Sequence, residues 1–389
     1  MQLSSEELVA LFKRVFNPVS PRDDSMTLLV DLPDEKTPDH KEWAARRAMA
    51  DGWRQALAGS RGELGMDVVV YVFPNVGRNN ADLPETFWPV GEGGVPASAS
   101  ELDPSAGLPR DEVLEKHPIH VALTEFSATA PLKVFAREHA IRAATMPGFR
   151  DSMIPALKLD YGEIGRRVEV LTKLLNRADK ARLVFDVDHT SAYHLTLDLR
   201  HRKAHASKGL FPAPGQVGNL PSGEAYIVPY EGERSGDPSK SEGYLPVQFG
   251  QEVVVYEIRR NVAVSVTTRG EASTREGDLL RREPAYGNLS ELGLGVLGPF
   301  GLEPTGEILL DEKLGLHIAF GRSDHFGGQV SPESFKDPEN VIHIDRVYVP
   351  KIQPKVSALS VDLYSPEGKA LALIRNNDYS IDFSRDPDF

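Results

Sequence analysis

The chain contains no cysteine in its 389 residues. This absence excludes a disulfide framework, a thiolate nucleophile and thiolate metal ligands. Any metal ion would therefore be held by histidine, aspartate and glutamate side chains, a donor set that suits zinc, cobalt, manganese or iron.

Basic charge is also scarce, with 44 lysines and arginines against 57 acidic residues and a net charge of −13. No run of basic residues is present, which argues against a nucleic-acid-binding protein. No apolar stretch approaches the length of a membrane span. The N-terminal segment lacks the basic start and the continuous apolar core of a signal peptide. We therefore expect a cytoplasmic protein that acts on a small molecule or peptide and binds neither nucleic acid nor membranes.

No glycine-rich phosphate loop follows any of the strand-like segments. A dinucleotide-binding site is therefore a poor hypothesis. The first half instead alternates short apolar runs, such as 26–32 and 66–74, with helix-like segments at 40–57 and 161–181. This alternation predicts an α/β domain whose mostly parallel sheet is covered by helices.

After residue 182 the sequence pattern changes: polar and apolar residues alternate, and turns occur at regular spacing. That pattern predicts strands rather than helices. We therefore expect two domains, an α/β domain at 1–181 and a β-rich (α+β) metal-binding catalytic domain at 182–389. One strand-like segment is rich in histidine and indicates a solvated or interface strand, with a contribution to the substrate side as the alternative. Its histidines are His189, His194, His201 and His205.

Histidines and acids gather in apolar, glycine-punctuated sequence near the C-terminus. The sequence HID places His343 and Asp345 two residues apart, so both side chains point to the same face of a strand. In DEKLGLHIAFG, Glu312 precedes His317 by five residues, and a turn at Gly315 would bring the two together. Each pair by itself is more typical of the polar outer face of an ordinary strand.

Two further glutamates lie where burial is expected. Glu224 follows a Pro–Ser–Gly turn at the start of a strand, and Glu291 lies in the apolar, glycine-rich sequence NLSELGLG. A carboxylate that is buried without a partner is costly. Coordination of a metal ion would remove that cost, and so would pairing with an arginine.

Taken in order, the motifs GEAYxxP, ELGLG, DEKxGxHIAxG and HID resemble those of the thermophilic-type metallo-aminopeptidases, the family of aminopeptidase T and related leucyl aminopeptidases. The resemblance covers mainly residues 215–350. It implies a homodimeric hydrolase of small peptides, in which two divalent ions (zinc, cobalt or manganese) activate a water molecule that attacks an amide bond. It also implies that Glu312 is the general base. By the same resemblance the metal ligands would be Glu224, Glu291, His317, His343 and Asp345.

One position departs from the family pattern. Members carry a tyrosine seven residues after the histidine that corresponds to His317, and here that position is Asp324. A phenol can donate a hydrogen bond to a tetrahedral intermediate, whereas an aspartate normally cannot. His325 and Arg322 are the candidate substitutes, and we count His325 among the candidate catalytic residues.

A related branch of the same fold implies an alternative activity. The 2,5-dihydroxypyridine dioxygenases hold one non-haem Fe(II) per chain with two histidines and one carboxylate, a set that His317, His343 and Asp345 would supply. These ring-cleaving dioxygenases carry histidine where this chain has Glu291, so the retained carboxylates of Glu224 and Glu291 favour the two-metal hydrolase. A metal-free binding protein on the same scaffold is the third hypothesis.

Overall fold

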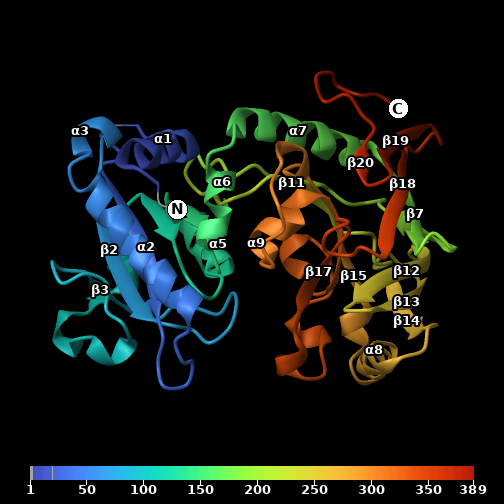
Figure 1. Cartoon of the computed structure of the whole chain (residues 1–389), viewed down its shortest axis with the longest axis horizontal. Coiled ribbons are helices and arrows are strands. Elements are labelled where there is room, and N and C mark those ends of the chain that lie inside the picture. The colour runs from blue at the N-terminus through green and yellow to red at the C-terminus, as the bar shows by residue number, and fades with distance from the viewer. Residues whose placement is uncertain (1–2, 20) are drawn as a thin grey trace. The chain divides into compact units, whose positions relative to one another are not determined.

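The computed structural model describes residues 3–19 and 21–389, whose strands form three sheets (Figure 1). The chain divides into two compact units. The first unit holds the described residues up to Tyr161 together with Ser207–Ser222, and the second holds Gly162–Ala206 together with Gly223–Phe389. No helix within the described residues combines the length and the apolarity needed to cross a membrane.

The first unit is built around a mostly parallel sheet with the strand order β10–β6–β5–β1–β2–β3–β4. Leu28, Leu29 and Val30 of the central strand are fully buried, as expected for a strand that is covered on both faces. The antiparallel pairs β2–β3 and β3–β4 form one edge. The strands are β1 (Ser25–Leu32), β2 (Asp67–Pro74), β3 (Thr86–Pro89), β4 (Leu108–Pro109), β5 (Ile119–Ala122), β6 (Arg142–Thr145) and β10 (Val217–Asn219). The helices are α1 (Ser5–Phe16), α2 (Lys41–Leu57), α3 (Arg61–Leu64), α4 (Arg110–Lys116), α5 (Thr129–Glu138) and α6 (Ile154–Leu157).

The division between the units differs from the expected boundary between residues 181 and 182. The chain first passes from one unit to the other at Tyr161, so that helix α7 (Tyr161–Arg177) belongs almost wholly to the second unit. Residues 207–222 then return to the first unit because β10 pairs in parallel with β6. The sequence of a short strand such as β10 does not indicate that its partner is a strand far away in the sequence.

The second unit contains two antiparallel sheets, in agreement with the expected β-rich character. The larger sheet has the order β14–β13–β12–β8–β7–β18–β19–β20, and the smaller sheet has the order β17–β16–β15–β11–β9. The strands of the larger sheet are β7 (Lys180–Val187), β8 (Ser191–Asp198), β12 (Glu242–Phe249), β13 (Glu252–Arg259), β14 (Val262–Val266), β18 (Val356–Tyr364), β19 (Ala370–Arg375) and β20 (Asp378–Tyr379). Those of the smaller sheet are β9 (His205–Ser207), β11 (Glu224–Ile227), β15 (Leu289–Gly295), β16 (Leu316–Gly321) and β17 (His343–Val347). Helix α8 (Glu271–Arg282) contacts β13 and β14, and α9 (Ile308–Asp311) continues into the 3₁₀ turn η6 (Glu312–Leu314).

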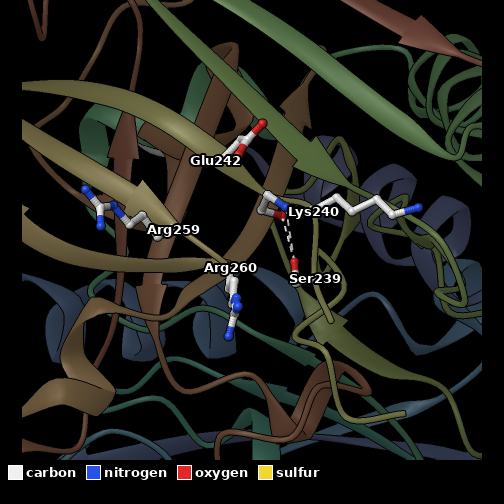
Figure 2. Close-up of a pocket in the computed structure, with 6 residues that line it drawn as sticks. Ser239, Lys240, Glu242, Arg259 and Arg260 are labelled. Carbon is white, nitrogen blue, oxygen red and sulfur yellow. Dashed lines mark hydrogen bonds between the residues drawn. The ribbon is translucent and has the colours of Figure 1, made fainter. Parts of the chain in front are cut away.

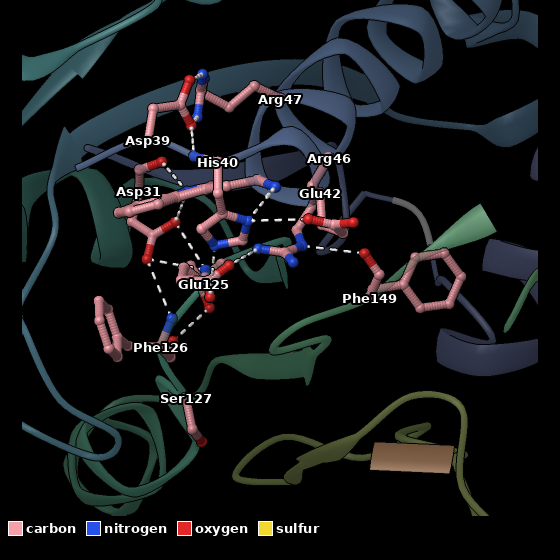
Figure 3. A network of polar contacts seen from close by, with 12 residues as sticks. Asp31, Asp39, His40, Glu42, Arg46, Arg47, Glu125, Phe126, Ser127 and Phe149 are labelled. Carbon is pink, nitrogen blue, oxygen red and sulfur yellow. Dashed lines mark hydrogen bonds and ion pairs between the residues drawn. The ribbon is translucent and has the colours of Figure 1, made fainter. Parts of the chain in front are cut away.

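A buried carboxylate joins three elements of the first unit at the carboxyl ends of β1 and β5 (Figure 3). Asp31 is 1% exposed, and its side chain accepts hydrogen bonds from Trp43 Nε1 (3.0 Å) and from the backbone N–H groups of Glu125 (2.8 Å) and Phe126 (3.2 Å). Arg46 extends the network, since it donates to Glu125 Oε2 (2.7 Å). The donors and acceptors of this network satisfy one another within the protein, which indicates a structural role.

Replacement of Asp31 tests this role. The change Asp31→Ala would leave buried N–H groups without an acceptor, so we expect the free energy of unfolding to fall by about 2–4 kcal/mol. Urea unfolding of the full chain measures the loss. The matched control is Asp24→Ala, because Asp24 is exposed at the other end of the same strand, and it should change stability by less than about 0.5 kcal/mol. Equal stability of the two variants would contradict the role.

Candidate metal centre

The strand registers of the smaller sheet bring all five candidate metal ligands to one face. Glu224 lies opposite Gly295, Glu291 opposite Ala319, and Gly293 opposite His317. On the next strand, Ala319 lies opposite Asp345 and Gly321 opposite His343. Directly opposed residues point to the same side of an antiparallel sheet. The five side chains therefore share a face, although they come from four strands.

Small residues alternate with the candidate ligands on this face and make room for them. Gly293 lies between strands that carry bulky side chains, and a methyl group at this position would overlap the imidazole ring of His317. At Gly295 a methyl group would overlap the backbone of Lys313. The glycines of the sequence ELGLG are therefore required because two other elements approach this strand closely.

The ligand atoms form two groups that share Glu291. The first group is Glu224, Glu291 and His317, and the second is Glu291, His343 and Asp345; in each, the possible ligand atoms lie within 4.8 Å of one another. His317 Nε2 lies 3.2 Å from Glu291 Oε1 and 3.4 Å from Glu224 Oε2. His343 Nε2 lies 3.3 Å from Glu291 Oε2. Ligand atoms about 2.1 Å from one ion in a tetrahedral site lie roughly 3.4 Å apart, so these separations fit metal coordination.

The hydrogen bonds of the two histidines also favour metal coordination by His317 and His343. His317 Nδ1 donates to the carbonyl oxygen of Gly315 (3.2 Å), and His343 Nδ1 donates to that of Arg322 (2.9 Å). Because a carbonyl only accepts, both rings carry a proton on Nδ1, and Nε2 is the nitrogen that faces the carboxylates and is available to a metal ion. This is the arrangement in which a second hydrogen bond orients a histidine toward a metal ion.

Two carboxylate oxygens in the centre are buried without a hydrogen bond among the described residues. They are Glu224 Oε2 and Asp345 Oδ1. Burial alone would lower the pKa of His317, but its hydrogen bond with Glu291 and the charges of Glu224 and Glu291 raise that pKa to about 10. The centre therefore attracts positive charge strongly, and the donor set fits a divalent cation.

A lysine that the sequence analysis did not consider lies within the centre. Lys313 is fully buried, and its ammonium donates to Glu224 Oε1 (2.6 Å) and to Glu312 Oε1. Glu312 is brought to the centre by this pairing. Burial and the charges of Glu224 and Asp345 raise the pKa of Glu312 well above its ordinary value, although Lys313 opposes the shift. Glu312 is therefore a stronger base than an ordinary exposed glutamate.

The loop after β16 holds the remaining sequence candidates. The carboxylate of Asp324 is bound by Arg322, with Nε to Oδ1 at 2.6 Å, so these two side chains pair with each other. The ring of His325 packs on Phe326, with centroids 3.8 Å apart, and lies 5.4 Å from the ring of His343. Burial and the neighbouring His343 lower the pKa of His325 to about 4, so its imidazole is neutral at physiological pH.

Tyr226 also lies on the metal-binding face, two residues after Glu224. Burial and the charges of Glu291, Glu224 and Glu312 raise the pKa of its phenol well above the ordinary value. Three residues of the centre, Lys313, Gly293 and Tyr226, were thus missed from the sequence. Gly293 and Tyr226 carried a usable signal, because each stands two residues from a candidate ligand on the same strand, Gly293 from Glu291 and Tyr226 from Glu224.

A hollow of about 440 Å³ in the same unit contains none of the candidate residues. It is lined by Ser239, Lys240, Ser241, Glu242, Arg259 and Arg260. Figure 2 shows the side chains of Lys240, Arg259 and Arg260 pointing in different directions rather than converging on one point. The hollow therefore lacks the convergent groups that a specific binding site needs.

Because the imidazole of His317 lies directly over Gly293, a larger residue at position 293 tests whether His317 is a metal ligand. We expect Gly293→Ala to displace the imidazole and to weaken metal binding by about 10–100-fold, the loss typical of disturbed ligand positioning. Metal titration followed by calorimetry measures the change. Gly277→Ala is the control, because a methyl group there meets only the end of the flexible Arg281 side chain. Unchanged metal affinity in Gly293→Ala would contradict the assignment of His317 as a ligand.

No protein-family model and no curated protein matches the chain. Solved structures do match it. A 2,5-dihydroxypyridine dioxygenase from Pseudomonas putida KT2440 aligns with a TM-score of 0.62 and 16% identity, over 98% of this chain and 100% of that chain. AmpT from Thermus thermophilus, a thermophilic aminopeptidase T, aligns with a TM-score of 0.56 and 15% identity, over 97% of this chain and 98% of that one.

Both similarities extend over nearly the whole of each chain, so they concern the two units together and not the metal-binding sheet alone. At these identities they show a shared fold. The resemblance inferred from the order of the motifs is confirmed at that level: the chain is similar in structure to an aminopeptidase T and to a 2,5-dihydroxypyridine dioxygenase.

Proposed function

We propose that the protein is a two-metal hydrolase that removes the N-terminal residue from small peptides. The observation that carries this proposal is the position of Glu291. Its Oε1 lies 3.2 Å from His317 and its Oε2 lies 3.3 Å from His343, so a single carboxylate belongs to both groups of ligands. Such a carboxylate would supply one ligand oxygen to each of two ions.

All five candidate ligands would be used if the site held two ions. Glu224 Oε2, Glu291 Oε1 and His317 Nε2 would hold one, and Glu291 Oε2, His343 Nε2 and Asp345 would hold the other. Divalent zinc, cobalt or manganese suits these ligands. Two such ions, when bound, supply Lewis acidity and lower the pKa of a water molecule.

Glu312 is proposed as the general base of this reaction. Its raised pKa allows it to accept a proton from the attacking water and then to deliver that proton to the leaving amine. Lys313 holds Glu312 and Glu224 at the same ammonium, which fixes the base relative to a metal ligand. His325 would stand at the substrate side as a neutral imidazole.

A ring-cleaving dioxygenase with one Fe(II) is the second candidate, and the structural similarity to the Pseudomonas enzyme favours it. His317, His343 and Asp345 would be the two histidines and the carboxylate of that site. The carboxylates of Glu224 and Glu291 weigh against it, because together with Asp345 they bring more negative charge than one divalent ion needs.

The role of Glu312 is tested by Glu312→Gln. Glutamine retains an acceptor for Lys313 but accepts no proton, so metal content should stay unchanged while kcat falls by about 100-fold or more. Glu303→Gln, an exposed glutamate of the same unit, should be active. Loss of metal from Glu312→Gln would show instead that Glu312 is a ligand.

The two candidate reactions differ in one reactant, since only the dioxygenase consumes O₂. Protein loaded with zinc, cobalt, manganese or Fe(II) should be assayed with aminoacyl anilides, small peptides and hydroxylated pyridines, with and without oxygen. We expect anaerobic release of an amine and two metal ions per chain. Strict dependence on O₂ with one iron per chain would replace the hydrolase by the dioxygenase.

A further inference from the structure

Tyr226 lies on the face of the smaller sheet that carries the five candidate ligands. It belongs to a row of directly opposed residues on neighbouring strands. It lies opposite Gly293 on β15, and Gly293 lies opposite His317 on β16. Because Gly293 has no side chain, the imidazole of His317 occupies the space over it, and Tyr226 is the next residue of the same row on the other side of Gly293. Tyr226 is thus next to the candidate ligands without being one of them.

The ring of Tyr226 is held in place by two aromatic neighbours. It stacks on His205, with centroids 5.1 Å apart and an angle of 20°, and it meets Phe326 edge-on at 4.9 Å. Phe326 in turn packs against the ring of His343 at 5.3 Å. His205 Nε2 donates to the carbonyl oxygen of Phe326 (2.9 Å), which ties the two neighbours together. A phenol fixed on both sides in this way loses little rotamer entropy when it binds a ligand.

The hydroxyl of Tyr226 is a donor that the protein itself does not use. Among the described residues no hydrogen bond involves it, and the side chain is only partly buried. The other strong donors of the centre are engaged. Lys313 is bound by Glu224 and Glu312, and the Nδ1 atoms of His317 and His343 donate to backbone carbonyls. The Tyr226 hydroxyl is therefore an unengaged neutral donor beside the carboxylates of the centre.

We propose that the Tyr226 hydroxyl donates a hydrogen bond to the substrate oxygen on which negative charge develops, an inference that rests on the proposed hydrolase. When the carbonyl of the scissile amide is attacked, its oxygen gains charge, and a donor held at a fixed position stabilises that charge without reorganisation. The phenol keeps its proton throughout, so Tyr226 assists the reaction without transferring a proton. The substrate it fits is one whose reacting group is a carbonyl or another oxygen that becomes anionic.

The variant Tyr226→Phe removes only the oxygen atom and keeps the ring that packs on His205 and Phe326. Its metal content and its melting temperature should match those of the unchanged protein. For an aminoacyl anilide, kcat should fall by about 100–1,000-fold, the usual cost of one oxyanion donor, while KM changes by less than about twofold. The control is Tyr244→Phe, because Tyr244 is exposed on β12.

A binding measurement separates the failure of this inference from the failure of the proposed hydrolase. Metal-loaded protein is titrated with an aminoacyl hydroxamate and, separately, with 4-nitrocatechol, both of which present an anionic oxygen to a metal centre. We expect Tyr226→Phe to weaken binding of the hydroxamate by about tenfold or more. If anilides are not cleaved but Tyr226→Phe weakens nitrocatechol binding to the same extent, the hydrolase is wrong and the role of Tyr226 stands. If the variant matches the unchanged protein in kcat and in both titrations, or if the unchanged metal-loaded protein binds neither probe, the role of Tyr226 is overturned.

Discussion

The burial of several carboxylates on one face of a small sheet is the constraint on which the second unit depends. Glu224 and Glu291 are 6% and 4% exposed, and the side chains of Asp345 and Glu312 are also largely buried. Like charges at short range in a medium of low dielectric repel strongly. Within the protein, Lys313 is the cation that pairs with two of these groups, and His317 and His343 contact the others. Such an arrangement is stable only where positive charge is supplied, which is the physical reason to regard it as a metal centre.

The two-residue period of a β-strand explains how this face coexists with an ordinary hydrophobic core. Along β15, Glu291, Gly293 and Gly295 lie on the face that carries the candidate metal ligands, while Leu292 and Leu294 are fully buried on the other. Strand β16 repeats the pattern, with His317, Ala319 and Gly321 on one face and Ile318 and Phe320 on the other. One face of the sheet therefore packs the core, and the small residues on the other face leave room for the His317 ring and for Lys313.

The chain shares its fold with a hydrolase and with an oxygenase, and a fold by itself does not determine a reaction. In both proposed functions His317, His343 and Asp345 would be metal ligands, and the two proposals differ in whether Glu224 and Glu291 also bind metal. In this chain Glu291 has one oxygen near each histidine, and Glu224 has one oxygen on Lys313 and the other near His317. These contacts give both glutamates a defined place in the centre, rather than leaving them as surplus charge. The unengaged phenol of Tyr226 adds a donor that neither histidine provides.

The sequence alone was sufficient for the features that depend on short spacing. Strand period placed His343 and Asp345 on one face, and the alternation of apolar runs with helix-like segments predicted the mostly parallel sheet of the first unit. The order of the motifs indicated which five residues to consider together.

Tertiary structure was needed for the rest, because a pattern within one strand does not state which strand will pair with it or in what register. Lys313 pairs with Glu224, which is 89 residues away in the sequence. Tyr226 and His317 lie in one row on either side of Gly293, and residues 207–222 return to the first unit. These relations arise from packing between segments far apart in the sequence, which no pattern within one segment encodes.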